Sequence, residues 1–407
     1  MKLIHGGVTA PIGFRANGIY CGIKTSKRRD LTLIVSEKVC EAAGVFTTNK
    51  VQASCVVINK ERLRDSKAQA IIANSGNANC MTGESGFENS RLMAATIARA
   101  LRINKKSVLV ASTGVIGKPL PIKKIVKSVP ELLKGLSRKG SEFAAAGILT
   151  TDRMIKEIAA EFLVGKKRVR VGAIAKGAGM IHPQMALIDR KHATMLCFVT
   201  TDAVITTAAL RDALARAVNK TFNTITIDGD MSTNDMVLIL ANGMAQNKKI
   251  VEKTKEFRLF TRALEGMFLS LAKQMVRDAE GATKFVEVSV KNALNREEAK
   301  QAAMTVAGSS LVKCALFGSD PNWGRIAAAV GYSGAHVDPW KLAIYLGKEL
   351  VLKSGGRVKK KAVILNRVFA KKNIKITVDL GVGKYGATAY TCDFSTNYVR
   401  INSTYRT

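Results

Sequence analysis

The stretch 176–202 constrains this chain most, because a glycine-rich turn leads there into a strand of buried type. The turn reads Lys176-Gly177-Ala178-Gly179-Met180-Ile181-His182-Pro183-Gln184-Met185, and the apolar run from Met195 is rich in β-favouring residues. Thr194 follows the small residue Ala193 and directly precedes this run. A hydroxyl in such a place can attack the preceding carbonyl and become a new N-terminus, whose α-amine then serves as its base. The stretch suggests self-cleavage between Ala193 and Thr194, although a threonine that simply enters a buried strand has the same pattern.

Further motifs are spread over the whole chain and together resemble one family. In chain order they are Phe46-Thr47-Thr48-Asn49, Asn74-Ser75-Gly76-Asn77-Ala78-Asn79, Ser112-Thr113-Gly114-Val115-Ile116-Gly117, Thr226-Ile227-Asp228-Gly229-Asp230, Ser232-Thr233-Asn234-Asp235, Glu280-Gly281-Ala282-Thr283-Lys284, Phe317-Gly318-Ser319-Asp320-Pro321-Asn322-Trp323-Gly324-Arg325 and Tyr398-Val399-Arg400-Ile401-Asn402. Their number and order resemble the glutamate N-acetyltransferase/ornithine acetyltransferase family of arginine biosynthesis. Precursors of that family carry the block Lys-Gly-Ser/Ala-Gly-Met-Ile-x-Pro-x-Met-Ala-Thr-Met-Leu, which the stretch 176–196 resembles.

This chain departs from the family block at one point, because residues 186–192 interrupt the Met-Ala-Thr sequence. If Met185-Ala186 were the family pair, the nucleophile position would hold Leu187, which has no group able to attack a carbonyl. Only Thr194 keeps the chemistry. We therefore interpret 186–192 as an inserted loop, which bears on how efficiently the chain is cut.

Hydrophobic periodicity indicates a mixture of strands and helices in one α/β or α+β fold. Strands are predicted at 31–36, 107–111, 285–290 and 374–380, and helices at 91–101, 207–218, 257–275 and 297–311. The resemblance implies a four-layer αββα sandwich of the ornithine acetyltransferase and DmpA type, with two sheets between helical layers. It also implies two chains after cleavage, an alpha chain of residues 1–193 and a beta chain of residues 194–407.

Composition favours an enzyme of the cytosol. The 407 residues are 47% hydrophobic, enough for a large core, and neither a membrane-spanning run nor the apolar core of a signal peptide is present. The seven cysteines form no C-x-x-C pair, so we expect reduced thiols rather than disulfides or a zinc site. We expect no cofactor, because no nucleotide-binding fingerprint occurs.

The net charge of +33, from 64 basic and 31 acidic residues, raises nucleic-acid binding as a rival function. The basic residues lie in short scattered patches with few aromatic residues between them, and no nucleic-acid-binding motif accompanies them. We therefore expect solvated surface charge and no specific nucleic-acid or membrane partner.

The resemblance implies the residues of the active site. Thr113 and Gly114 match the oxyanion pair of the family, at the end of a predicted strand where backbone N–H groups can stabilise a developing negative charge. The substrate-binding residues that it implies are Thr150, Lys176, Thr194, Glu280, Asn402 and Thr407. Lys176 suits a substrate carboxylate and Glu280 an ammonium group. His182 is interpreted as part of the turn, and neither it nor His192 has a partner acid at an informative spacing.

The expected activity is transfer of the acetyl group from N2-acetylornithine to L-glutamate through acetyl-Thr194, with acetyl-CoA open as a further donor. The resemblance also implies an alpha2beta2 heterotetramer. A related N-terminal-nucleophile aminopeptidase would use the same threonine with water as the acceptor. A basic nucleic-acid-binding protein is the non-enzyme alternative, and its affinity would fall steeply with salt.

Overall fold

The structure is a computed structural model that describes residues 1–185, 187 and 195–404. Within these residues nine strands form a large mixed sheet in the order β1-β6-β7-β8-β9-β3-β4-β5, with β2 paired to β3. The bounds of these strands are β1 (Lys2–Ile4), β2 (Phe14–Ile19), β3 (Leu31–Phe46), β4 (Lys67–Asn77), β5 (Val108–Val115), β6 (Lys156–Val164), β7 (Lys167–Lys176), β8 (Leu196–Thr201) and β9 (Met236–Ala241).

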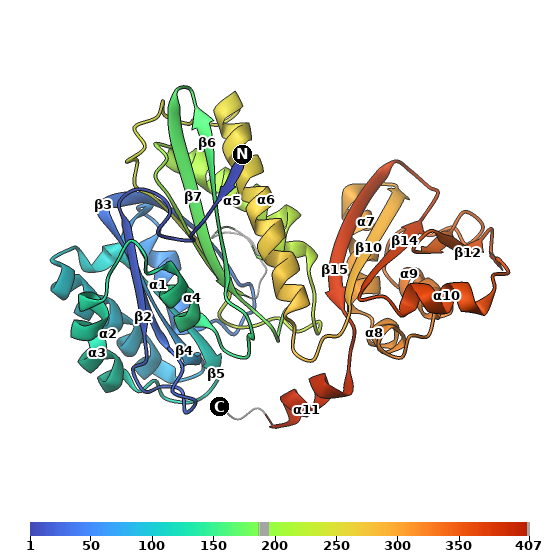
Figure 1. Ribbon diagram of the computed structural model, residues 1–407, viewed down its shortest axis with the longest axis horizontal. Coiled ribbons are helices and arrows are strands. Elements are labelled where there is room, and N and C mark those ends of the chain that lie inside the picture. The colour runs from blue at the N-terminus through green and yellow to red at the C-terminus, as the bar shows by residue number, and fades with distance from the viewer. Residues whose placement is uncertain (186, 188–194, 405–407) are drawn as a thin grey trace.

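A second, smaller sheet follows in the chain and lies apart from the first (Figure 1). Its order is β13-β12-β11-β14-β10-β15. Its strands are β10 (Phe285–Ala293), β11 (Ala343–Leu346), β12 (Glu349–Lys353), β13 (Gly356–Arg357), β14 (Asn373–Asp379) and β15 (Tyr385–Cys392).

Helices cover both faces of the large sheet, because its central strands are apolar on both sides. Along β8, Leu196 and Phe198 join the core under α1 to α4, whereas Cys197 and Val199 join the core under α5 and α6. Helices α7 to α10 share a third core with the second sheet. The bounds are α1 (Ser54–Arg62), α2 (Gly83–Leu101), α3 (Ile122–Lys134), α4 (Ser141–Ile148), α5 (Thr207–Lys220), α6 (Lys255–Arg277), α7 (Arg296–Gly308), α8 (Ser310–Phe317), α9 (Trp323–Gly331), α10 (Ala362–Phe369) and α11 (Thr396–Thr404), with short 3-10 turns at Lys105–Ser107 and Phe222–Thr224.

This mixed α/β sandwich confirms the predicted fold class, although helices cover both faces of the large sheet, which differs from the predicted layering of two sheets between helices. The predicted elements fall on observed ones with one exception. The predicted strands lie at β3, β5, β10 and β14, and three predicted helices lie within α2, α5 and α6. The single helix predicted over 297–311 is wrong, because α7 ends at Gly308. Ser309 is extended, with ψ 114°, and its hydroxyl accepts a hydrogen bond from the Val312 N–H at 3.4 Å, so it caps a separate helix, α8.

The boundary predicted between residues 193 and 194 crosses the large sheet. Strands β8 and β9 follow the boundary in sequence, yet they lie between β7 and β3, which precede it. β8 pairs antiparallel with β7 and parallel with β9. The two predicted chains would therefore share one sheet, and its hydrogen bonds would hold them together.

None of the described helices is long and apolar enough to span a membrane. Six of the seven cysteines are buried free thiols, and Cys314 is an exposed one. Within the described parts of the chain no group of three or more His, Cys, Asp or Glu side chains could hold a metal ion.

Candidate active site

One cavity of about 140 Å³ brings together residues that are far apart in the sequence. Met195, the residue bonded to Thr194, lines it, whereas Ala193, Thr194 and Thr407 lie outside the described residues. The predicted site residues that line the cavity are Thr113, Gly114, Thr150, Lys176, Glu280 and Asn402. All the predicted site residues that the structure describes therefore share one cavity.

Gly114 lies where β5 approaches β4 too closely for any side chain. Its φ is +135°, in a region that side chains rarely adopt. A Cβ atom there would lie 2.4 Å from the carbonyl carbon of Gly76 and 2.5 Å from the nitrogen of Asn77. The strand register shifts at this point, between Gly76 and Asn77. Glycine is thus required at 114, and Thr113-Gly114 forms a tightly packed part of the cavity wall.

Lys176 is the cation of the cavity, and it is largely withdrawn from solvent at the end of β7. Its Nζ donates a hydrogen bond to Thr150 Oγ1 at 2.7 Å and lies 3.7 Å from Asp152 Oδ2. Burial alone would raise the pKa of Asp152, but the charges of Lys176 and Lys156 hold that pKa well below its usual range. Asp152 is therefore an anion that fixes the position of the Lys176 ammonium group.

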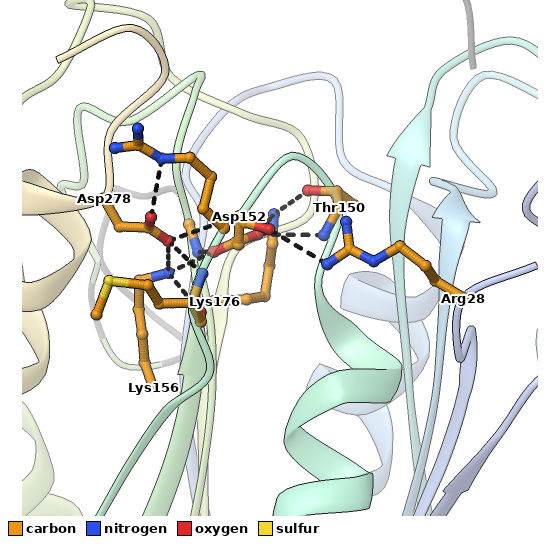
Figure 2. A network of polar contacts seen from close by, with 9 residues as sticks. Arg28, Thr150, Asp152, Lys156, Lys176 and Asp278 are labelled. Atoms are coloured by element: carbon orange, nitrogen blue, oxygen red, sulfur yellow. Dashed lines mark hydrogen bonds and ion pairs between the residues drawn. The ribbon is translucent and has the colours of Figure 1, made fainter. Parts of the chain in front are cut away.

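A buried network continues behind Asp152 (Figure 2). Lys156, which is fully buried, joins Asp152 Oδ1 at 2.8 Å to Asp278 Oδ2 at 2.5 Å. The backbone N–H groups of Arg153 and Met154 also donate to Asp278, at 3.1 and 3.2 Å. Sequence reasoning missed this network, although Asp152 stands in the Thr150-Thr151-Asp152 motif.

Glu280 is the anion of the cavity and faces the C-terminal helix. Its Oε2 accepts a hydrogen bond from Asn402 Nδ2 at 2.8 Å, and Asn402 belongs to α11, which runs back from the second sheet (Figure 1). The backbone N–H of Glu280 donates a hydrogen bond to the Ala178 carbonyl at 2.9 Å. A Cβ atom on Gly179 would lie 2.4 Å from Glu280 Oε2. The glycine turn thus makes room for this carboxylate.

The rest of the turn is held by the segment that precedes β9. Asp228 accepts hydrogen bonds from the backbone N–H groups of Met180 and Ile181, at 2.6 and 2.8 Å. The His182 ring contacts Thr226 Oγ1 at 3.0 Å. His182 does not line the cavity, which agrees with its interpretation as a turn residue, and His192 lies outside the described residues.

Sequence reasoning gave no role to Asn234 and Asp235, which also line the cavity. Asn234 Nδ2 donates to the carbonyls of Ala78 and Ser112, at 2.6 and 2.8 Å, and so ties the segment before β9 to β5 and to the residue that follows β4. Asp235 is 2% exposed, and burial raises its pKa well above the usual value. The available signal was the Ser232-Thr233-Asn234-Asp235 motif, an unusually polar run directly before an apolar strand.

A small cavity that gathers Lys176, Glu280 and several hydroxyl and amide groups in a mixed α/β fold is typical of an enzyme that acts on small polar molecules. The chain belongs to the ArgJ family, because the model of that family matches residues 15–407.

Individual relatives agree over the full length. The chain is 46% identical to the arginine biosynthesis bifunctional protein ArgJ of Caldanaerobacter subterraneus subsp. tengcongensis, covering 100% of both chains. It is also 46% identical to the glutamate N-acetyltransferase of Methanocaldococcus jannaschii, again over 100% of both. A solved ArgJ chain from Bacillus halodurans is 43% identical to this chain, with a TM-score of 0.50. The match covers 52% of this chain and 100% of that one.

Proposed function

We propose that this chain transfers the acetyl group of N2-acetylornithine to L-glutamate, giving ornithine and N-acetylglutamate. The observation that carries the proposal is the meeting of Lys176 and Glu280 in one cavity with Thr113-Gly114 and Met195. In this proposal an amino acid binds with its carboxylate on Lys176 and an ammonium group on Glu280, because both charged residues line the same small cavity. The names of the relatives, a glutamate N-acetyltransferase and a bifunctional protein of arginine biosynthesis, support this activity.

We propose Thr194 as the nucleophile, released by cleavage after Ala193. Its neighbour Met195 lines the cavity, which supports a nucleophile at this position. Cleavage of the 407 residues would give chains of 193 and 214 residues, held together by the shared sheet. The solved Bacillus halodurans chain matches only 52% of this one, a length that suits one product of such a cut. We expect two copies of each chain in an alpha2beta2 heterotetramer in the cytosol.

The reaction then proceeds in two halves. Thr194 Oγ adds to the acetyl carbonyl carbon and its proton passes to the α-amine, while Thr113-Gly114 stabilises the oxyanion. The bond from this carbon to the ornithine nitrogen breaks, and that nitrogen takes the proton. In the second half the glutamate amine attacks the acetyl ester and the threonine hydroxyl is restored. Asn402, Thr150 and Thr407 would add hydrogen bonds to the bound amino acid.

A denaturing gel with intact-mass measurement tests the cleavage without any substrate. Wild type should show chains of 193 and 214 residues, and Thr194→Ala should stay whole. A folded wild-type chain that remains uncut would exclude Thr194 as an N-terminal nucleophile.

The transfer is tested by following ornithine release from N2-acetylornithine. Without glutamate, ornithine should appear once per site and then slowly, because water is a poorly positioned acceptor. Glutamate should restore turnover with parallel-line initial-rate kinetics. Release of free acetate at the same rate with and without glutamate would indicate a hydrolase instead. A parallel assay with acetyl-CoA and glutamate decides whether acetyl-CoA also serves as donor.

A further inference from the structure

A second cavity adjoins the candidate active site, and the proposed reaction leaves it unused. It measures about 280 Å³ and shares Thr150 and Thr151 with the active-site cavity. Lys176 Nζ donates a hydrogen bond to Thr150 Oγ1 at 2.7 Å. Arg28, which lines the second cavity, donates to the backbone carbonyl of Asp152 at 3.4 Å (Figure 2). The segment 150–152 is therefore a wall that the two cavities have in common.

The lining of the second cavity combines positive charge with hydroxyl groups. It includes two cations, Lys24 and Arg28, and four hydroxyl side chains, Thr25, Ser26, Thr150 and Thr151. None of the described residues that line it is acidic. The hydrogen bonds that the structure gives the two cations go to backbone carbonyls, and that of Lys24 Nζ goes to Arg29 at 2.6 Å. A cavity of this composition suits a carboxylate.

The loop that carries Lys24 is fixed by a buried carboxylate. Asp30, which is fully buried, accepts hydrogen bonds from the backbone N–H groups of Ile23 and Lys24, at 2.7 and 2.9 Å. A Cβ atom on Gly76 would lie 3.0 Å from Lys24 Cγ, so this glycine makes room for the lysine. Burial lowers the pKa of Lys24 to about 8, the attraction of Asp30 only partly opposes this, and the charge of Lys176 lowers the pKa as well. A bound anion would offset the cost of keeping this ammonium group out of water.

The proposed reaction needs a place for a second carboxylate. N2-acetylornithine and glutamate share an α-carboxylate, which suits Lys176, but their side chains end in opposite charges. Glu280 suits the side-chain ammonium of ornithine and would repel the side-chain carboxylate of glutamate. Among the described residues of the active-site cavity, Lys176 is the only cation. The side chain of glutamate therefore requires a cation outside that cavity.

We propose that the second cavity binds the side-chain carboxylate of the acceptor glutamate, through Lys24 and Arg28. This inference rests on the proposed acetyl transfer. With its α-carboxylate on Lys176, glutamate extends past Thr150 and Thr151 into the second cavity, whereas the side chain of ornithine turns toward Glu280. The two substrates thus share one contact and separate at their side chains. Lys24 and Arg28 select the acceptor and take no part in binding the donor.

The test uses Lys24→Met, which removes the charge and keeps the length of the side chain. Arg28→Met is a second variant, and because Arg28 is exposed this change should leave the fold intact. The matched control is Lys27→Met, since Lys27 is exposed on the same loop but lines neither cavity. The two halves of the reaction are measured separately, as the initial burst of ornithine from N2-acetylornithine alone and as kcat/KM for glutamate. Thermal melting shows whether each variant is folded.

We expect kcat/KM for glutamate to fall at least about tenfold in Lys24→Met and in Arg28→Met, because each loses a charge-assisted hydrogen bond. The rate of the ornithine burst should stay within about threefold of wild type in both variants, since the donor does not enter the second cavity. Lys27→Met should match wild type in both halves.

A kcat/KM for glutamate within about threefold of wild type in either folded variant would overturn the proposal. An equal fall in both halves would also overturn it, because that result indicates a structural role. If Lys24→Met melts early, Arg28→Met decides alone. A wild type that releases no ornithine, or that turns over equally fast without glutamate, would instead refute the proposed function itself.

Discussion

Replacing Gly114 with alanine should damage catalysis through a movement that can be estimated from the structure. The new Cβ would lie 2.4 Å from the Gly76 carbonyl carbon, about 1 Å inside the ordinary contact distance of roughly 3.5 Å between carbon atoms. Strands β4 and β5 must therefore separate by about 1 Å at the cavity wall. A displacement of this size costs about 100-fold in turnover, and loss of one oxyanion donor costs about 100- to 1000-fold. We expect kcat of Gly114→Ala to fall by at least about 100-fold.

The matched control is Gly117→Ala, three residues further along. Gly117 has a φ of +80°, but among the described residues, its two chain neighbours aside, no atom lies within 4 Å of a Cβ built there. Gly117→Ala would therefore carry the cost of a side chain at positive φ, about 1–3 kcal/mol, but no steric clash. Both variants are compared by kcat for acetyl transfer, thermal melting and the extent of cleavage. If Gly114→Ala keeps kcat within threefold of Gly117→Ala, the tight approach of β4 and β5 does not shape the oxyanion site.

Three further predictions concern the charges around the cavity. Gly179→Ala would place a Cβ atom 2.4 Å from Glu280 Oε2, so KM for N2-acetylornithine should rise about tenfold or more while gel analysis shows normal cleavage; an unchanged KM would remove Glu280 from the substrate site. Lys156→Met leaves the Asp152 and Asp278 carboxylates uncompensated and should lower the free energy of unfolding by about 3–5 kcal/mol, measured in denaturant; a loss under 1 kcal/mol would contradict this. The pKa of Asp152 in the folded protein lies below its unfolded value of about 3.9, so the stability that the ionised Asp152 contributes is complete above that pH and is lost as the pH falls further. The melting-temperature deficit of Asp152→Asn should therefore shrink from pH 7 toward pH 3. A deficit that stays constant over this range would exclude a titrating role for Asp152.

Much of the cavity could be predicted because its residues stand at visible changes in the sequence pattern. Thr113-Gly114 follows a continuous apolar run in β5, and Lys176 ends β7 just before the Gly177-Ala178-Gly179 turn. Such positions gather at the edge of a sheet, where active sites form. The family resemblance added Glu280 and Asn402 to the predicted site. The sequence pattern around each residue could not show that they are neighbours, and the structure joins them by a 2.8 Å hydrogen bond.

The supporting charges could not be predicted, because their meaning depends on partners far away in the chain. Lys156 and Asp278 are 122 residues apart, and each taken alone looks like an ordinary solvated charge. Only the fold shows that Lys156 is fully buried between two carboxylates. The break between α7 and α8 was missed for a different reason. Apolar spacing continues through Ser309, and the decisive evidence is the capping geometry of that one residue.

The place of β8 in the large sheet bears on how a chain terminus could serve as a catalytic group. Chain ends usually fray, and a frayed end cannot hold a nucleophile in position. Here Leu196–Thr201 is paired along its whole length with β7 on one side and β9 on the other. A cut before residue 194 would break none of these ladder hydrogen bonds, and the Met236 N–H would still hold the Met195 carbonyl at 2.7 Å. The proposed new terminus would therefore begin one residue from a doubly paired strand, and this anchoring would suit the role that we propose for Thr194.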